Sequence, residues 1–198
     1  MMERWSIIES AAREMGGFIH TAQIEALGIS RPMIRKYVEA GYLEVVRKGL
    51  YALTDDIQDE YALLQAQSTK AIFSYGTALF LWGMSDRTPH IYDITVPWGT
   101  NISRLKKNIS NLRCHYAQAT VYELGIAETI SPQGALVRLY DKERCICDLI
   151  RDKNQVDLQL YTGALKEYFR TKPNPRKLLK YGKQFGIEEK IHTYMEVL

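Results

Sequence analysis

Residues 17–53 combine helix caps, a glycine turn and short apolar runs in an order that few small folds accommodate. The Thr21 hydroxyl can cap a helix over residues 22–27, because such side chains accept hydrogen bonds from the free amides of a first helical turn. Gly28 then permits a sharp turn, and Ser30 can cap a second helix over residues 31–40. Two short helices joined by a tight turn predict a helix-turn-helix.

A β-hairpin is expected directly after the second helix. Gly41 ends that helix, and two apolar runs follow, over residues 42–46 and 50–53, on either side of the basic, glycine-containing segment 47–49. Such runs around a short turn are typical of a strand and a return strand. Together the two elements predict a winged DNA-binding module whose second helix enters the major groove.

The charges of this segment favour phosphate contact. Ile34, Tyr37 and Val38 share the inner face of the second helix, which leaves its cationic side chains pointing elsewhere. Between residues 31 and 53 there are five Lys or Arg and two Glu. Clustered cations beside a helix that fits the major groove can neutralise DNA phosphates, and this favours binding because counterions are released. The candidate DNA-contacting cations are Arg31, Arg35, Lys36, Arg47 and Lys48. Two alternatives stay open: the charges only solvate a small helical domain, or the helix-turn-helix binds protein.

Composition sets broad limits on the rest of the chain. The 198 residues carry a formal charge of +3 and three cysteines. An odd, small number of cysteines without an export signal indicates a reducing cytoplasm and no disulfide framework. The longest uncharged apolar-rich stretch, residues 71–85, is shorter than a membrane span and contains Ser, Thr and Gly, so no membrane association is expected.

A domain boundary is expected near Thr54, where an acidic stretch follows the hairpin. This predicts a winged domain over residues 1–55 and a second domain over residues 56–198. The winged domain should begin with a helix whose apolar stripe is Trp5, Ile8, Ala12 and Met15. The second domain should open with a helix to about residue 70, because acids favour the positive end of a helix dipole. Its inner stripe would be Ile57, Tyr61 and Leu64.

The second domain should contain one small sheet followed by helices. Strands are expected over residues 71–74, 91–96, 112–116, 126–130 and 135–140, with a short buried helix over residues 77–84 between the first two. Helices are expected over residues 142–151, 158–170, 176–185 and 188–198. The chain is therefore predicted to be α+β, with an N-terminal winged helix-turn-helix and a helical C-terminal half.

A second cationic segment lies near the C-terminus. Residues 166–183 contain seven cationic residues and one acid. The cations are Lys166, Arg170, Lys172, Arg176, Lys177, Lys180 and Lys183. They fit either the solvated outer face of two helices or a second polyanion contact. Tyr168, Phe169 and Tyr181 lie among them at a helical spacing that is more typical of a core than of base-stacking side chains.

No catalytic constellation emerges from the residues. Neither a phosphate-binding glycine loop nor a nucleophile elbow is present. Cys145 and Cys147 lack a second ligand pair for structural zinc, so they are expected to be buried apolar side chains, and no metal or cofactor is expected. The alternative is a metal nuclease that uses Asp141, Glu143 or Asp148. Against it, no expected strand carries a carboxylate-x-Lys motif near another acidic residue. We therefore expect no enzymatic activity.

The residues resemble a known family over nearly the whole chain. The similar segments are GFIHT at 17–21, LGIS at 27–30, GYLEVVRKGLY at 41–51, FSYGTALFLWGM at 73–84, the segment 89–97 that begins with Pro89 and ends in ITVP, and YDKERCICDLI at 140–150. In order and spacing they look like the AbiEi-type antitoxins of abortive-infection, type IV toxin–antitoxin systems.

The resemblance implies two activities. The N-terminal domain would repress its own operon by binding inverted repeats in the promoter, and the C-terminal domain would neutralise a toxin that resembles a nucleotidyltransferase. It assigns DNA contact to the five cations named above, with Thr21 and Ser30 as phosphate contacts through hydroxyls or helix amides. The alternative is a plain winged-helix regulator whose C-terminal domain senses a ligand or oligomerises.

Overall fold

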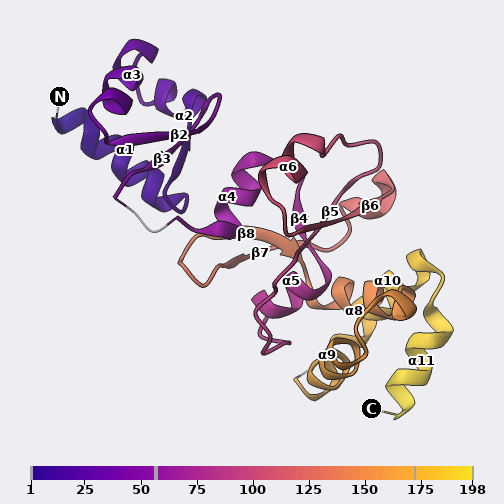
Figure 1. The fold of residues 1–198 in the computed structure, drawn as a ribbon. Helices are drawn as coiled ribbons and strands as arrows, with labels where there is room; N and C mark the ends of the chain where they lie inside the picture. The colour runs from indigo at the N-terminus through magenta and orange to yellow at the C-terminus, as the bar shows by residue number, and fades with distance from the viewer. Residues whose placement is uncertain (1, 56–57, 172, 198) are drawn as a thin grey trace. The chain divides into compact units, whose positions relative to one another are not determined.

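The computed structural model describes residues 2–55, 58–171 and 173–197 (Figure 1). The chain forms two compact units. Unit 1 comprises residues 1–69 together with 130–137, and unit 2 comprises residues 70–129 and 138–198. The expected α+β class is confirmed, with a small sheet and helices at the N-terminus and a second sheet followed by a helical C-terminal half.

Unit 1 contains a three-stranded sheet with the strand order β1-β3-β2. Its helices are α1 (Met2–Glu14), α2 (Thr21–Ala26), α3 (Arg31–Glu39) and α4 (Glu60–Gln67). Its strands are β1 (Phe18–His20), β2 (Leu43–Arg47) and β3 (Leu50–Leu53). The order of helix, turn, helix and hairpin matches the prediction, whereas β1 was missed because three residues are too few to show a period-two pattern.

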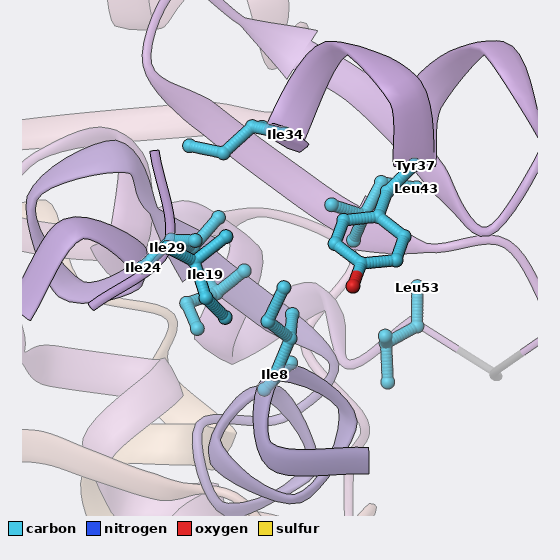
Figure 2. Close-up of a cluster of buried hydrophobic side chains, with 9 residues drawn as sticks. Ile8, Ile19, Ile24, Ile29, Ile34, Tyr37, Leu43 and Leu53 are labelled. Carbon is cyan, nitrogen blue, oxygen red and sulfur yellow. The ribbon is translucent and has the colours of Figure 1, made fainter. Parts of the chain in front are cut away.

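One face of this sheet closes the core of the winged module (Figure 2). Successive strand residues point to opposite faces, so Ile19 and Leu53 lie on this face. They pack with buried side chains from α1, α2, the turn and α3, namely Ile8, Ala12, Ile24, Ile29, Ile34 and Tyr37, and with Leu43 of β2. Trp5 covers the edge of the cluster with its ring centroid 5.4 Å from that of Tyr37. The expected stripe of the first helix is confirmed except at Met15, which follows α1 and is exposed.

The opposite face of the sheet has a core of its own. Phe18, Leu50 and Ala52 point to this face, and Ala62 of α4 and Ala135 complete the cluster. These partners come from beyond residue 55, because the two faces of the sheet are both apolar and the first 55 residues cover only one. The expected boundary between two functional domains at residue 55 stays a prediction. The compact unit that contains the winged module extends beyond that residue, to residue 69, and also includes residues 130–137.

The helix after the hairpin is shorter than expected. It begins at Glu60, with the Asp59 carboxylate accepting hydrogen bonds from the amides of Tyr61 and Ala62. Tyr61 and Leu64 are buried, as the predicted stripe requires. Ile57, the third member of that stripe, lies outside the described residues.

Unit 2 is built on a five-stranded mixed sheet with the order β6-β5-β4-β8-β7. The strands are β4 (Ile72–Phe73), β5 (Tyr92–Pro97), β6 (Leu112–Ala117), β7 (Ile126–Ile130) and β8 (Leu136–Tyr140). All five were predicted to within two residues at each end. β5 pairs parallel to β6 and antiparallel to β4, and β4 pairs parallel to β8. Residues 130–137, which end β7 and begin β8, group with unit 1.

Seven helices of the described chain belong to unit 2. They are α5 (Tyr75–Leu81), α6 (Ser103–Asn108), α7 (Ala119–Tyr122), α8 (Lys142–Arg151), α9 (Leu158–Arg170), α10 (Pro175–Phe185) and α11 (Glu188–Val197), with a 3-10 turn at Lys153–Gln155. The predicted caps of α8 and α10 are confirmed: Asp141 accepts from the Arg144 amide and Asn174 from the Lys177 amide. Helix α10 packs against α8 and α11, and α9 also packs against α8 (Figure 1).

Candidate DNA-binding surface

Helix α3 presents two unpaired cations to solvent. Ile34 and Tyr37 are buried in the core of the winged module, and Val38 packs against it (Figure 2). This orientation leaves Arg35 and Lys36 exposed on the other side of the helix. Within the described residues neither side chain has an acidic partner. Both are therefore available for a groove or a phosphate.

The first cation of α3 is held by the preceding helix. The Arg31 Nε lies 2.7 Å from Glu25 Oε1 of α2, and the Arg31 side chain is 76% exposed. An ion pair between exposed side chains contributes little to stability, so it can open when a phosphate competes for the guanidinium. Arg31 is thus next to Arg35 and Lys36 on α3, but it is paired with Glu25.

Of the two hydroxyl residues predicted to cap helices, Ser30 is at the expected position and Thr21 is not. Ser30 is the cap residue of α3, with an extended backbone, but its side chain makes no cap hydrogen bond. The prediction that Thr21 caps α2 is wrong, because α2 begins at Thr21 itself and His20 is the cap residue. The Thr21 amide donates to the Gly49 carbonyl at 3.0 Å. That amide is therefore already used, and only the hydroxyl of Thr21 is left for a phosphate.

The hairpin that forms the wing turns at Lys48 and Gly49. Arg47 pairs with Leu50 across the two strands, and Gly49 has a φ of 81°, a conformation that glycine adopts without strain. Lys48 is exposed at the turn and has no acidic partner among the described residues. It is therefore the exposed cation of the wing.

Arg47 is directed inward instead. Its Nη2 donates to the Ala66 carbonyl near the end of α4 at 3.0 Å, and its Nε is buried without a hydrogen-bond partner. The Arg47 side chain therefore links the wing to α4. This contact could not be predicted from the sequence, because α4 lies outside the segment that predicts the wing.

His20 is a part of this surface that sequence reasoning missed. Its amide donates to Gln23 Oε1 at 2.8 Å, which closes the first turn of α2. Burial and, second, the positive charge of Arg47 lower the pKa of His20 below its usual range, although the backbone groups of Gly49 and Ala66 oppose this. At neutral pH the imidazole is therefore uncharged and adds no cation to the surface.

Most of the second cationic segment is exposed, but two of its members are paired. Arg170 binds Glu167 at 2.8 Å, and Lys177 lies 3.0 Å from Asp141 and 3.2 Å from Glu143. Lys172 lies outside the described residues. The other four have no acidic partner in the part of the chain that is described: Lys166, Arg176, Lys180 and Lys183. The last three lie four and three residues apart on α10 and so share one face.

The aromatic side chains of that segment belong to the core. Tyr168 and Tyr181 are 2% and 7% exposed, and they donate hydrogen bonds to Glu143 and Asp141 respectively. The expectation of core aromatics is confirmed for these two, while Phe169 is half-buried. Tyr168 and Tyr181 are therefore not available as stacking partners beside the exposed cations of α9 and α10.

The acids considered for a nuclease site serve the fold of unit 2. Asp141 caps α8, Glu143 accepts from Tyr168, and Asp148 pairs with Arg144 at 3.0 Å. Cys145 and Cys147 are fully buried, as expected, and Cys114 is half-buried. Among the described residues, no three His, Cys, Asp or Glu side chains gather in a way that could hold a metal ion.

The winged segment matches a known family. Residues 6–54 match the family described as "Transcriptional regulator, AbiEi antitoxin". Residues 6–54, called the AbiEi domain below, are therefore similar to this family. The resemblance expected from the sequence is confirmed over these residues, which include every candidate DNA-contacting side chain of the AbiEi domain from Thr21 to Lys48.

A solved structure shares the fold over a longer range than the AbiEi domain. It is the crystal structure of the RV2827C protein from Mycobacterium tuberculosis, with a TM-score of 0.58 at 14% sequence identity. The similarity covers 90% of this chain and 71% of that one. No curated protein sequence matches the chain. Within the described residues, none of the helices has the length and apolar character needed to cross a bilayer.

Proposed function

We propose that this protein is the antitoxin of a type IV, abortive-infection toxin–antitoxin system and also represses its own operon. In this proposal residues 1–55 bind inverted repeats in the promoter, and residues 56–198 neutralise a toxin that resembles a nucleotidyltransferase. The observation that carries the proposal is the AbiEi match over the residues that form the winged module. The protein acts in the cytoplasm and has no enzymatic activity of its own.

The geometry of unit 1 supports DNA as the partner. Arg35 and Lys36 on α3 and Lys48 on the wing are exposed cations without acidic partners among the described residues. A helix that carries cations beside a basic hairpin fits a major groove and the flanking phosphates. We assign direct contact to these three, exchangeable contact to Arg31, and hydroxyl contacts to Thr21 and Ser30. Arg47 positions the wing through Ala66.

The DNA-binding half is tested with the full chain and a duplex from its own promoter. The double variant Arg35→Ala/Lys36→Ala should weaken binding and lower the slope of log affinity against log salt by about 0.9 for each lost phosphate contact. A lost base contact should instead cost about 1–3 kcal/mol and relax the sequence preference. Lys190→Ala, which removes an exposed cation of α11, is the matched control and should bind normally. Unchanged affinity of the double variant would refute the assignment to α3.

The antitoxin half is tested by growth rescue, with the neighbouring toxin gene driven from an unrelated promoter. The full-length double variant is preferable to a truncation after residue 55, because truncation separates Phe18, Leu50 and Ala52 from Ala62 and Ala135. Rescue by a variant that no longer binds the promoter would establish neutralisation independent of repression. If neither the parent nor the double variant rescues growth from this unrelated promoter, the protein acts through transcription alone.

A cleft in unit 2 favours a second candidate, a regulator that senses a small ligand. The cleft has a volume of about 570 Å³ and is lined by Gly76, Asp93, Arg113 and Leu160 among others. Its size falls in the range of small-molecule sites. A neighbouring gene that is harmless when expressed, together with a metabolite that changes promoter affinity, would favour this candidate over the antitoxin.

A further inference from the structure

Trp98 is the most exposed tryptophan of this chain and lies at a rigid turn in unit 2. The Trp98 side chain is 76% exposed, whereas Trp5 packs against the core of the winged module and Trp82 donates its indole hydrogen to the Tyr140 carbonyl. The Trp98 amide donates to the Ala117 carbonyl at 2.8 Å, and the Thr100 amide donates to the Pro97 carbonyl. The backbone at Trp98 is thus fixed by hydrogen bonds, and the indole ring is largely exposed.

A second exposed aromatic side chain lies beside it. Tyr116 of β6 is 46% exposed, and its ring centroid lies 6.5 Å from that of Trp98, with the rings inclined by 58°. β6 is an edge strand of the sheet, and Tyr116 pairs in register with Val96 of β5. The two rings therefore form one aromatic patch at the edge of the sheet.

The surroundings of this patch are cationic. Residues 97–122 contain Arg104, Lys106, Lys107 and Arg113 and no Asp or Glu. Arg113 points toward Asp93 on the other face of β6, at 3.6 Å. The other three lie on α6, are exposed, and have no acidic partner among the described residues.

Helix α6 lies on the same side of β6 as Tyr116. Cys114 and Tyr116 are two residues apart on the strand and so share a face, while Arg113 and His115 share the other. The Lys106 ammonium is close enough to lower the pKa of the Cys114 thiol, although burial, the larger effect, raises it. On the opposite face His115 stacks on Tyr75 of α5 at 4.0 Å. Trp98 and α6 also belong to the same connection between β5 and β6, so the cations of α6 follow the Trp98 ring closely along the chain.

We propose that Trp98, Tyr116 and the cations of α6 bind single-stranded nucleic acid. Bases stack on the Trp98 and Tyr116 rings, and Arg104, Lys106 and Lys107 contact the phosphates. Exposed aromatic rings beside a cationic track are the elements that such binding requires. A duplex does not fit the same surface, because the faces of its bases are covered by their neighbours in the stack. A site of this kind adds to promoter binding by the winged module and does not depend on it.

The proposal is tested with labelled 12-mers of single-stranded RNA and DNA and a 12-base-pair duplex, measured by fluorescence anisotropy. The full chain with Arg35→Ala/Lys36→Ala serves as the background, so that the winged module contributes little. We expect binding of the single strands in this background and quenching of Trp98 fluorescence. Comparing the RNA and DNA 12-mers shows which sugar the site prefers.

Variants then locate the site. Trp98→Ala should weaken single-strand binding about 5- to 150-fold, the range found when one stacking ring is removed. Trp98→Phe should retain most of the binding while losing the quenching signal. Lys106→Gln/Lys107→Gln should lower the salt slope by about 0.7 per phosphate contact. Leu158→Ala, which removes another exposed apolar side chain, is the control and should bind like the parent.

Two results would overturn the proposal. The first is a lack of single-strand binding at low salt, or equal binding by the Trp98→Ala variant and the parent. The second is a change of oligomeric state in Trp98→Ala, measured by light scattering, with unchanged nucleic-acid binding. That second result would assign the aromatic patch to contact between copies of this chain.

Discussion

Ser131 donates its hydroxyl hydrogen to the carboxylate of Asp59, 72 residues earlier in the chain. Both side chains belong to unit 1, and both are almost fully buried, at 4% and 1% exposure. The same carboxylate caps α4, and the Ser131 oxygen in turn accepts from the Ala135 amide at 3.1 Å. One buried carboxylate thus joins the start of α4 to residues 130–137.

We expect Asp59→Ala to destabilise unit 1 by about 2–4 kcal/mol. The loss combines a missing helix cap, worth about 0.5–2 kcal/mol, with a buried Ser131 hydroxyl that has lost its acceptor, worth about 1–3 kcal/mol. Asp59→Asn keeps an acceptor oxygen and should lose less. Chemical denaturation measures both. In Asp59→Ala the further change Ser131→Ala should cost less than it does in the parent, because only the hydrogen bond from the Ala135 amide is then lost. A full additional loss from Ser131→Ala would show that the two side chains act independently.

Gly16 should tolerate no side chain. Its φ is +76°, and a Cβ there would lie 2.7 Å from the Cβ atoms of both Ala62 and Ala135. Gly41 has nearly the same φ, +75°, with no atom within 4 Å. Gly41→Ala should therefore cost only the backbone strain, about 1–2 kcal/mol. Gly16→Ala should cost about 1–3 kcal/mol more because of overpacking. Equal melting temperatures of the two variants would contradict the close contact.

Arg144 is a buried cation whose removal should leave an unpaired acid. The guanidinium is 1% exposed, pairs with Asp148, and lies 4.1 Å from the centroid of the Tyr140 ring. Arg144→Met should destabilise unit 2 by about 3–5 kcal/mol, because Asp148 stays buried with only Arg151 as a partner.

The double variant Arg144→Met/Asp148→Leu is the test of that reason. It should recover a large part of the loss, since no buried charge is left uncompensated. Denaturation midpoints compare the two variants. If the double variant is as unstable as the single one, the loss comes from the Val121 and Leu124 carbonyls, which Arg144 also binds, and not from the uncompensated buried charge of Asp148.

The pKa of His20 should report on the position of Arg47. Burial, and then the Arg47 charge, lower the pKa of His20 below 6.5. The folded state therefore binds its proton less readily than the unfolded state, so this contribution to stability is full above about pH 6.5 and is lost as the pH falls from there through the folded pKa. Arg47→Gln should raise the pKa of His20, which an NMR titration of the imidazole measures. Thermal unfolding at pH 7.5 and 5.5 should differ less in His20→Gln than in the parent.

Local signals in the sequence were sufficient for most of the helices and strands. Asp141 and Asn174 cap helices as expected, and the five strands of unit 2 each follow a short apolar run. Two short helices, α6 and α7, were missed because four to six residues show no clear period. The cap predicted at Thr21 is wrong because a hydroxyl residue in the first turn of a helix has the same local pattern as a cap residue one position earlier.

The candidate site could be predicted only where it depends on helix periodicity. Burial of Ile34 and Tyr37 followed from their spacing, and so did the exposure of Arg35 and Lys36. The different environment of Arg47 could not be foreseen, because its partner Ala66 is 19 residues away on another helix. The pairing of Lys177 with Asp141 and Glu143 was equally hidden, since it depends on how α10 packs against α8.

The participation of residues 130–137 in unit 1 has a consequence for the order in which the chain folds during synthesis. The N-terminal residues leave the ribosome first, but Ala135 and Ser131 complete the second core of their sheet and satisfy Asp59. The winged module therefore emerges with one apolar face of its sheet still uncovered, and it reaches its final stability only after most of the chain has been translated. A nascent chain interrupted before residue 130 should be more sensitive to proteases than the finished protein.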